Sequence, residues 1–294
     1  MYDYKFLDVE EIQANDTDIF KKKFLNKKPV VIRNFFSNCR AAKCWTNEYF
    51  EEKAGRKKVK VTRGIGGKYT NSYLTLKEYL KWLDGDNSRD RTKDEEFYYM
   101  CNNTLEMIDS ILVNDFNFTP KIFVGEWYMK NFIKIMPVYY GNKNMVTPLH
   151  YDSLGAHNSF FQMRGRKLFI LIPFEQIDNC YISSDGGNSL VDFEHPDFLK
   201  FPKFKNVTPI KADLNSGDLL YLPPYTLHYV KGKEINISMN IEWHTKDSVL
   251  KTFTSGYTKS LRHFYWNFLF ILGLWCYVPN SLIIMIYKMR FRLL

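Results

Sequence analysis

The stretch Val146-Thr-Pro-Leu-His150-Tyr-Asp152 places a histidine and an aspartate two residues apart, where a short apolar segment ends. A second segment, Leu219-Leu-Tyr-Leu-Pro-Pro-Tyr-Thr-Leu-His228, is expected to form one strand that also ends in a histidine. Alternate residues of a strand share one face, so His150 and Asp152 can reach one ion, and a sandwich can bring the strand of His228 opposite. Two histidines and one carboxylate are the ligand set typical of non-haem Fe(II) sites.

Each fragment of this pattern also has a plain structural explanation. A His-x-Asp triplet occurs by chance in many proteins, and a lone histidine after an apolar strand is more often a satisfied, partly buried side chain. Lys167 opens the apolar run Lys167-Leu-Phe-Ile-Leu-Ile172, where it is either an edge lysine that discourages aggregation or a buried counter-ion. A 2-oxo acid on the iron would need such a cation and a hydroxyl, and Thr147 offers the hydroxyl.

The surrounding sequence, residues 126–245, has the pattern of a mainly β core. Short apolar runs are separated by turn signals such as Gly141-Asn-Lys-Asn144 and Asn215-Ser-Gly-Asp218, and roughly eight short strands at this spacing favour a sandwich or jelly roll. The runs are Phe132 to Met136, Phe160 to Met163, Leu168 to Pro173, Val207 to Lys211, Leu219 to Pro223 and Ile235 to Ile241.

Residues 1–125 are expected to form a mixed α/β part that packs on this core. The predicted elements are a strand at Pro29 to Ile32, a helix at Trp45 to Ala54 that stops at Gly55, an alternating strand at Lys57 to Thr62, a helix at Thr75 to Leu83 capped by Thr75, and a loop at Asp84 to Glu96.

Composition sets wide limits on function. The 294 residues are 45% hydrophobic and 17% aromatic, which favours a folded chain over disorder. The net charge of +9 favours acidic partners such as nucleic acid or anionic lipid without identifying one. Five cysteines, an odd count, and a polar start without a signal peptide predict an intracellular protein, cytoplasmic or nuclear.

Residues 246–294 are expected to form a helical, hydrophobic tail. Residues 264–287 contain no Asp, Glu, Lys or Arg, and basic residues flank them, which fits a membrane-spanning helix. Pro279-Asn-Ser281 interrupts the run, however, and would divide it into two short helices. Such a pair fits an apolar homodimer interface equally well, so membrane contact through 264–287 and dimerisation are both retained.

Several of these stretches together resemble the JmjC-domain hydroxylases of the cupin superfamily, and most closely the class that contains the asparaginyl hydroxylase factor inhibiting HIF and the JmjC-type tRNA wybutosine hydroxylase. The resemblance extends over about residues 5–245. The stretches that carry it are Val146 to Asp152, Asn158 to Lys167, Val191 to Asp197, Phe201 to Phe204 and Gly217 to His228, with Lys28 to Ile32, Trp45 to Phe50 and Phe97 to Tyr99 in the amino-terminal half.

The resemblance implies a double-stranded β-helix and Fe(II)- and 2-oxoglutarate-dependent hydroxylation, with O2 as the second cosubstrate. Its iron ligands fall on His150, Asp152 and His228. Its contacts to the C5 carboxylate of 2-oxoglutarate fall on Lys167, Thr147 and Tyr99, and its asparagines near the iron and the C1 carboxylate fall on Asn158 and Asn240.

Three departures from the family pattern concern the substrate. The spacer between Asp152 and Asn158 is longer than usual, His157 is an additional histidine expected near the site rather than on the metal, and Leu227 stands where the asparaginyl hydroxylase has tryptophan. A protein side chain is the first expected substrate. A tRNA base, N-methyl-lysine demethylation, and a non-catalytic cupin module tethered by its tail are the alternatives.

Overall fold

The computed structural model describes residues 2–65, 68–86, 97–116, 136–152, 155–184, 187–254 and 261–279, with positions 281, 282, 285 and 289 beyond them. The strands are β1 (Leu7–Asp8), β2 (Glu11–Gln13), β3 (Val30–Arg33), β4 (Lys58–Ile65), β5 (Lys68–Thr75), β6 (Phe97–Thr104), β7 (Pro137–Gly141), β8 (Val146–His150), β9 (His157–Arg164), β10 (Lys167–Ile172), β11 (Ile210–Leu214), β12 (Leu219–Leu222), β13 (Leu227–Gly232) and β14 (Asn236–Trp243). The helices are α1 (Thr17–Ile19), α2 (Arg40–Cys44), α3 (Asn47–Ala54), α4 (Leu76–Asp86), α5 (Leu105–Ile108), α6 (Lys246–Thr254) and α7 (Leu261–Trp275), with shorter helical turns at η1 (Phe20–Phe24), η2 (Ser110–Asp115), η6 (Phe174–Asn179) and η7 (Pro202–Asn206).

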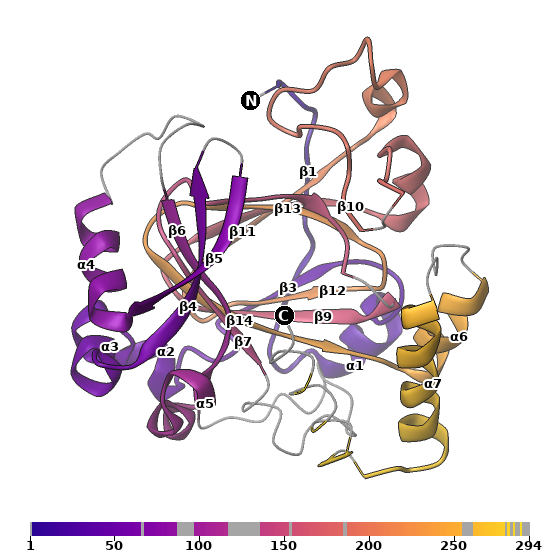
Figure 1. The fold of residues 1–294 in the computed structure, drawn as a ribbon. Coiled ribbons are helices and arrows are strands. Elements are labelled where there is room, and N and C mark those ends of the chain that lie inside the picture. The colour runs from indigo at the N-terminus through magenta and orange to yellow at the C-terminus, as the bar shows by residue number, and fades with distance from the viewer. Residues whose placement is uncertain are drawn as a thin grey trace.

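The strands form two sheets that face each other. The minor sheet has the order β1-β11-β10-β13-β8, and the major sheet has the order β2-β3-β12-β9-β14-β7-β6-β4-β5. In Figure 1, β10 and β13 run across from β9 and β12. Apolar side chains from both sheets form a buried cluster between them. These inner residues include Phe160 and Leu222 from the major sheet and Phe169, Leu171 and Val230 from the minor sheet. The expected fold class, mainly β with a cupin-type jelly roll and flanking helices, is confirmed.

Strands from the amino-terminal residues extend the major sheet at both ends. At one end, β3 pairs with β12 of the core. At the other end, β6 pairs with β7 of the core, and β4 and β5 follow β6 to the edge of the sheet. Helices α3 and α4 cover the outer face of this extension (Figure 1), with Phe50 and Tyr79 completely buried there.

Local signals in this half place most elements where the sequence predicts them. Helix α3 begins after the cap Thr46 and ends at Gly55. Helix α4 follows the predicted cap, because the Thr75 hydroxyl accepts from the Glu78 N–H at 3.2 Å while the Glu78 carboxylate accepts from the Thr75 N–H at 2.8 Å. The helix continues to Asp86, so the loop expected from Asp84 begins later, and its remainder at 87–96 lies outside the described residues.

The single strand predicted from Leu219 to His228 is wrong. Strand β12 ends at Leu222 in the major sheet, and β13 begins at Leu227 in the minor sheet. Pro223 and Pro224 have no backbone N–H to donate to a ladder, and Tyr225 adopts a left-handed φ of 63°, so the chain turns here. The turn carries the chain from one sheet to the other and places His228 on the minor sheet.

The remaining predicted strands of the core differ from the structure at their ends. The run at Val207 to Lys211 becomes β11, which begins at Ile210, and the run at Ile235 to Ile241 becomes β14, which continues to Trp243. The run at Phe132 to Met136 lies outside the described residues except for Met136.

A β-bulge in β8 brings the side chains of Thr147 and His150, two predicted site residues, to the same face of the strand. His228 pairs with His150, and Val230 pairs with Thr147, so β8 advances three residues while β13 advances two. Residues three apart on a regular strand point to opposite faces. The extra residue removes this conflict, and the bulge includes Pro148, a residue that regular ladders exclude.

The carboxy-terminal tail folds back on the major sheet. Helix α7 buries Leu269 and Phe270 against the core, and the Phe270 ring stacks on His244 with centroids 3.8 Å apart. Among the described residues, no helix combines the length and the apolar character needed to cross a membrane. Helix α7 ends at Trp275, before Pro279, which breaks the long apolar run as expected. Dimerisation through the tail stays a prediction.

Candidate metal centre

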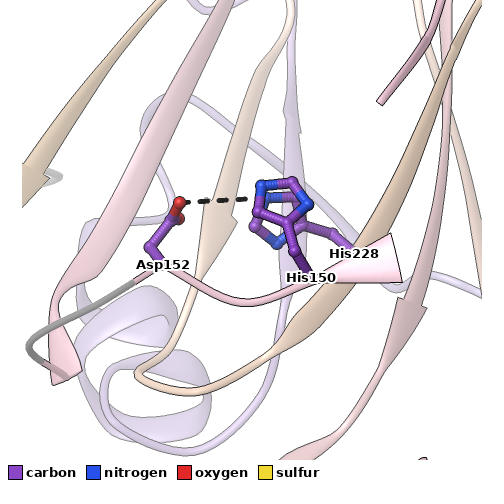
Figure 2. A group of neighbouring side chains, drawn as sticks. All are labelled: His150, Asp152 and His228. Carbon is purple, nitrogen blue, oxygen red and sulfur yellow. Dashed lines mark ion pairs between the residues drawn. The ribbon is translucent and has the colours of Figure 1, made fainter. Parts of the chain in front are cut away.

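His150, Asp152 and His228 meet at one end of the space between the sheets. Their ligating atoms all lie within 4.8 Å of one another, so the three residues could hold one metal ion. The two imidazole rings have centroids 4.2 Å apart, and His228 Nε2 lies 4.0 Å from Asp152 Oδ1. In Figure 2 the Asp152 carboxylate faces the two imidazole rings, which overlap in this view, with His150 at the end of its strand and Asp152 just beyond it.

Backbone carbonyls fix which nitrogen of each histidine is available. His150 Nδ1 lies 2.8 Å from the Pro148 carbonyl, and His228 Nδ1 lies 3.1 Å from the Thr226 carbonyl. A carbonyl oxygen accepts but cannot donate, so each Nδ1 carries the proton and each Nε2 keeps its lone pair. Burial, and after it the electrostatic effect of His150, lowers the pKa of His228 to about 4. This ring is therefore neutral at physiological pH. Both rings are therefore prepared as metal ligands.

The carboxylate of Asp152 is oriented from the opposite sheet. Asn158, on β9 of the major sheet, donates from Nδ2 to Asp152 Oδ2 at 2.7 Å. Oδ1 of Asp152 faces His228. Residues 153 and 154 of the unusually long spacer lie outside the described residues, but its two ends are tied together by this hydrogen bond. Two imidazole nitrogens and one carboxylate oxygen are a donor set that would fit a divalent ion such as Fe(II).

Lys167 is buried inside the same space. Its side chain is 3% exposed, its Nζ donates to Ser238 Oγ at 2.6 Å, and it lies 5.6 Å from the centroid of the Tyr139 ring. In the described part of the chain it forms no ion pair. Burial lowers the pKa of Lys167 from its ordinary value to about 7. The site thus holds a buried amine whose described contacts are neutral, and an anionic ligand would stabilise its protonated form.

The other sequence-predicted site residues line the same inner space. Burial raises the pKa of Tyr99, and a hydrogen bond with the Thr147 side chain acts in the opposite direction, so these two residues are in contact. The Tyr99 ring packs over Gly141, where a Cβ would lie 2.8 Å from the ring, so a larger residue would displace it. Asn240 is 3% exposed on β14, the strand that also carries Ser238.

His157 does not point toward the metal centre. It is completely buried, its Nδ1 lies 2.8 Å from the Tyr221 hydroxyl, and its ring stacks on Trp243 with centroids 4.4 Å apart. Tyr221 and Trp243 belong to the core behind the major sheet. His157 and Asn158 are adjacent on β9, so their side chains lie on opposite faces of the major sheet. Asn158 faces the candidate metal centre, and His157 packs in the core on the other face.

Sequence reasoning did not identify Ser238, Tyr139 or Glu242 as residues of this space. Ser238 and Glu242 alternate along β14 with Ile237, Met239 and Ile241, which belong to the core behind the major sheet. This two-residue period could have placed Ser238 and Glu242 on the inner face. Tyr139 lies on β7, one strand from the predicted Tyr99.

Comparisons with known proteins agree with this architecture. Residues 16–248 match the family described as the Cupin-like domain. The chain is 29% identical over 251 residues to JmjC domain-containing protein D of Dictyostelium discoideum, which covers 75% of this chain and 52% of that protein. It is 27% identical over 229 residues to lysine-specific demethylase JMJ30 of Arabidopsis thaliana, covering 75% and 51%.

A third relative is of more similar length. The human tRNA wybutosine-synthesizing protein 5 is 23% identical over 237 residues, with 74% of this chain and 71% of that protein covered. The chain spans about half the length of the first two relatives, so their full activities are not transferred by similarity. The match over residues 16–248, together with the two facing sheets and the histidine–aspartate–histidine centre, shows that this chain belongs to the Cupin-like domain family and is related to JmjC-domain proteins.

Proposed function

We propose that this protein is an Fe(II)- and 2-oxoglutarate-dependent dioxygenase that hydroxylates a C–H bond of a protein side chain. In the balanced reaction, the C–H bond, 2-oxoglutarate and O2 give the C–OH product, succinate and CO2. The observation that carries the proposal is the buried Lys167 in the same inner space as the His150, Asp152 and His228 triad. A metal site alone is compatible with many functions, whereas a metal site with a buried cation beside it fits a bidentate, dianionic cosubstrate.

The residues of the site would divide the work between ligation and binding. His150, Asp152 and His228 would hold the iron, which supplies the oxidising power when 2-oxoglutarate and O2 are bound. Lys167 would bind the C5 carboxylate, beside the hydroxyls of Thr147 and Tyr99. Asn158 would keep the Asp152 carboxylate in place, and Asn240 would lie near the C1 carboxylate. The inner apolar side chains would exclude water from the reaction.

A modified tRNA base is a second candidate substrate. The net charge of +9 and the relative named tRNA wybutosine-synthesizing protein 5 support it. Demethylation of N-methyl-lysine, suggested by the relatives named lysine-specific demethylases, would begin with the same hydroxylation and end with loss of formaldehyde from the hydroxylated methyl group.

The first prediction concerns metal binding. His150→Ala and His228→Ala should each weaken Fe(II) or Co(II) binding by about 100-fold or more, because each removes one of three ligands, while His195→Ala, which alters an exposed histidine, should leave affinity unchanged. Anaerobic titration calorimetry measures the affinity. Equal affinity in all four proteins would exclude this metal centre.

The second prediction concerns activity. The wild-type protein should form succinate from 2-oxoglutarate when Fe(II) and O2 are supplied, and Asp152→Ala should reduce the rate by about 100-fold or more, because the metal loses its carboxylate ligand. Succinate is measured by mass spectrometry. Loss of succinate on removal of O2 controls for contaminating decarboxylases, and turnover by Asp152→Ala at the wild-type rate would contradict the proposal.

The third prediction concerns pH. Burial lowers the pKa of Lys167 to about 7, so the amine is largely neutral above that pH before the cosubstrate binds. A dianion should bind the protonated amine and raise its pKa, so binding should take up roughly one proton at about pH 8.5 and weaken by up to roughly tenfold per pH unit above about pH 8. Calorimetry in two buffers of different ionisation enthalpy, with Mn(II) present, measures the uptake.

Two variants make this pH experiment specific. Lys167→Met should lose both the affinity for 2-oxoglutarate and the proton uptake while it keeps Mn(II) binding, and Lys143→Met, which alters an exposed lysine in the turn before β8, should behave as wild type. Loss of Mn(II) binding in Lys167→Met, or an affinity independent of pH in the wild type, would show that Lys167 has another role.

A further inference from the structure

Polar side chains line the inner face of β14. Ser238 accepts a hydrogen bond from Lys167, which shows that its side chain points into the space between the sheets. Ile237, Met239 and Ile241 belong instead to the core behind the major sheet. Side chains alternate along a strand, so Asn240 and Glu242 follow Ser238 on the inner face. Glu242 is the last inner residue of this strand and is partly exposed.

Glu242 stands directly across from the residue that orients a metal ligand. Its Cα partner on β9 is Asn158, whose amide holds Asp152 at 2.7 Å. Directly opposed residues of an antiparallel pair have Cβ atoms about 4.5–5.5 Å apart, so the Glu242 and Asn158 side chains are neighbours. The surroundings of Tyr139 agree, because burial, then the charges of Tyr99, Glu242 and Asp152, raise the pKa of its phenol. Tyr139 therefore lies within electrostatic reach of both carboxylates.

Two amide oxygens beside Glu242 lack donors. Asn158 Oδ1 and Asn240 Oδ1 are buried and have no hydrogen-bond partner among the described residues. The orientation of Asn158 is fixed, because the Asp152 carboxylate accepts only and so requires the Nδ2 side of the amide. Buried acceptors are normally satisfied, so these oxygens indicate a ligand that brings N–H groups.

The charges separate this position from the C5 end of the expected cosubstrate. The C5 carboxylate of 2-oxoglutarate fits beside Lys167, at the Ser238 level of β14, whereas the Glu242 carboxylate would repel an anionic group at its own end of the strand. A guanidinium or ammonium group has the opposite preferences, because it carries several N–H donors and a positive charge that a carboxylate stabilises. The acceptor cluster thus suits a cation that enters beside the metal from the partly exposed end of β14.

We propose that Glu242 binds the positively charged side chain of the substrate, an arginine or lysine, and holds it beside the metal centre with help from Asn158. This inference rests on the proposed function and narrows its substrate class. Glu242 would set the specificity and would not ligate the metal. The charge on the substrate, rather than its hydrophobic surface, would then decide which side chains are oxidised.

The test uses the full-length protein with Fe(II), 2-oxoglutarate and four peptide mixtures of random flanks around a fixed central arginine, lysine, leucine or glutamate. Oxygen incorporation into peptide and succinate formation are both measured by mass spectrometry. We expect the wild type to oxidise the arginine or lysine mixture at least about tenfold better than the other two. Glu242→Gln should remove at least about tenfold of this preference, and Glu242→Lys should shift it toward the glutamate mixture.

Controls separate the failure of this inference from the failure of the proposed function. Glu234→Gln removes the same charge from an exposed residue just before β14 and should keep the wild-type preference. Succinate formed without peptide by Glu234→Gln should match the wild type, and each Glu242 variant is judged by the ratio of its rates on the four mixtures. A cationic preference that survives in Glu242→Gln and Glu242→Lys, oxidation centred on the leucine mixture, or oxidation of an added single-stranded RNA mixture in place of peptides would overturn the inference. Absence of succinate under every condition would overturn the proposed function and this inference with it.

Discussion

The pairing of His150 with His228 across β8 and β13 is the contact on which the rest of the site depends. Both histidines lie on the minor sheet, and each is held by a backbone carbonyl two residues earlier in the chain. The third candidate ligand, Asp152, accepts a hydrogen bond from Asn158 of the major sheet. The candidate metal centre therefore contacts both sheets, and a change in their separation would move Asn158 away from the carboxylate that it orients. Preformed orientation of this kind reduces the cost of assembling the site when a ligand arrives.

The interior between the sheets divides into a positive end and a negative end. Lys167 and Ser238 lie on the side where β6 and β7 contribute Tyr99 and Tyr139. Glu242 lies further along β14. A buried lysine beside aromatic rings is destabilising by itself, and burial accordingly lowers its pKa to about 7. An anionic ligand would compensate the charge of the protonated lysine, so the position of this buried lysine indicates where such a ligand binds.

The sequence predicted the fold class and singled out the His-x-Asp pair because both depend on local patterns, whereas His228 reaches His150 only through long-range strand pairing. The His-x-Asp spacing, the apolar runs and the caps at Thr75 and Gly55 all act within a few residues. The turn at Pro223 to Thr226 was missed because apolar residues continue through it. The hydropathy pattern does not change where the chain passes from the major sheet to the minor sheet. The bulge at Pro148 also escaped, although the odd spacing of Thr147 and His150 required one. Long-range register alone placed Glu242 opposite Asn158.

The structure explains two departures of this sequence from the family pattern, His157 and Leu227. His157 and Leu227 point away from the interior, one into the core behind the major sheet and the other into the core behind the minor sheet. Neither side chain lines the site, so neither identifies the substrate. Asn158, Asn240 and Glu242, which lie on the inner faces of β9 and β14, are better indicators of the substrate.

We propose that one inner space holds both a divalent metal and 2-oxoglutarate. The decisive measurement is a crystal structure of the protein grown without oxygen, with Mn(II) and 2-oxoglutarate. We expect Mn(II) to be coordinated by His150, Asp152 and His228, and the C5 carboxylate of 2-oxoglutarate to be paired with Lys167. A metal held by other residues, or 2-oxoglutarate bound away from Lys167, would contradict it.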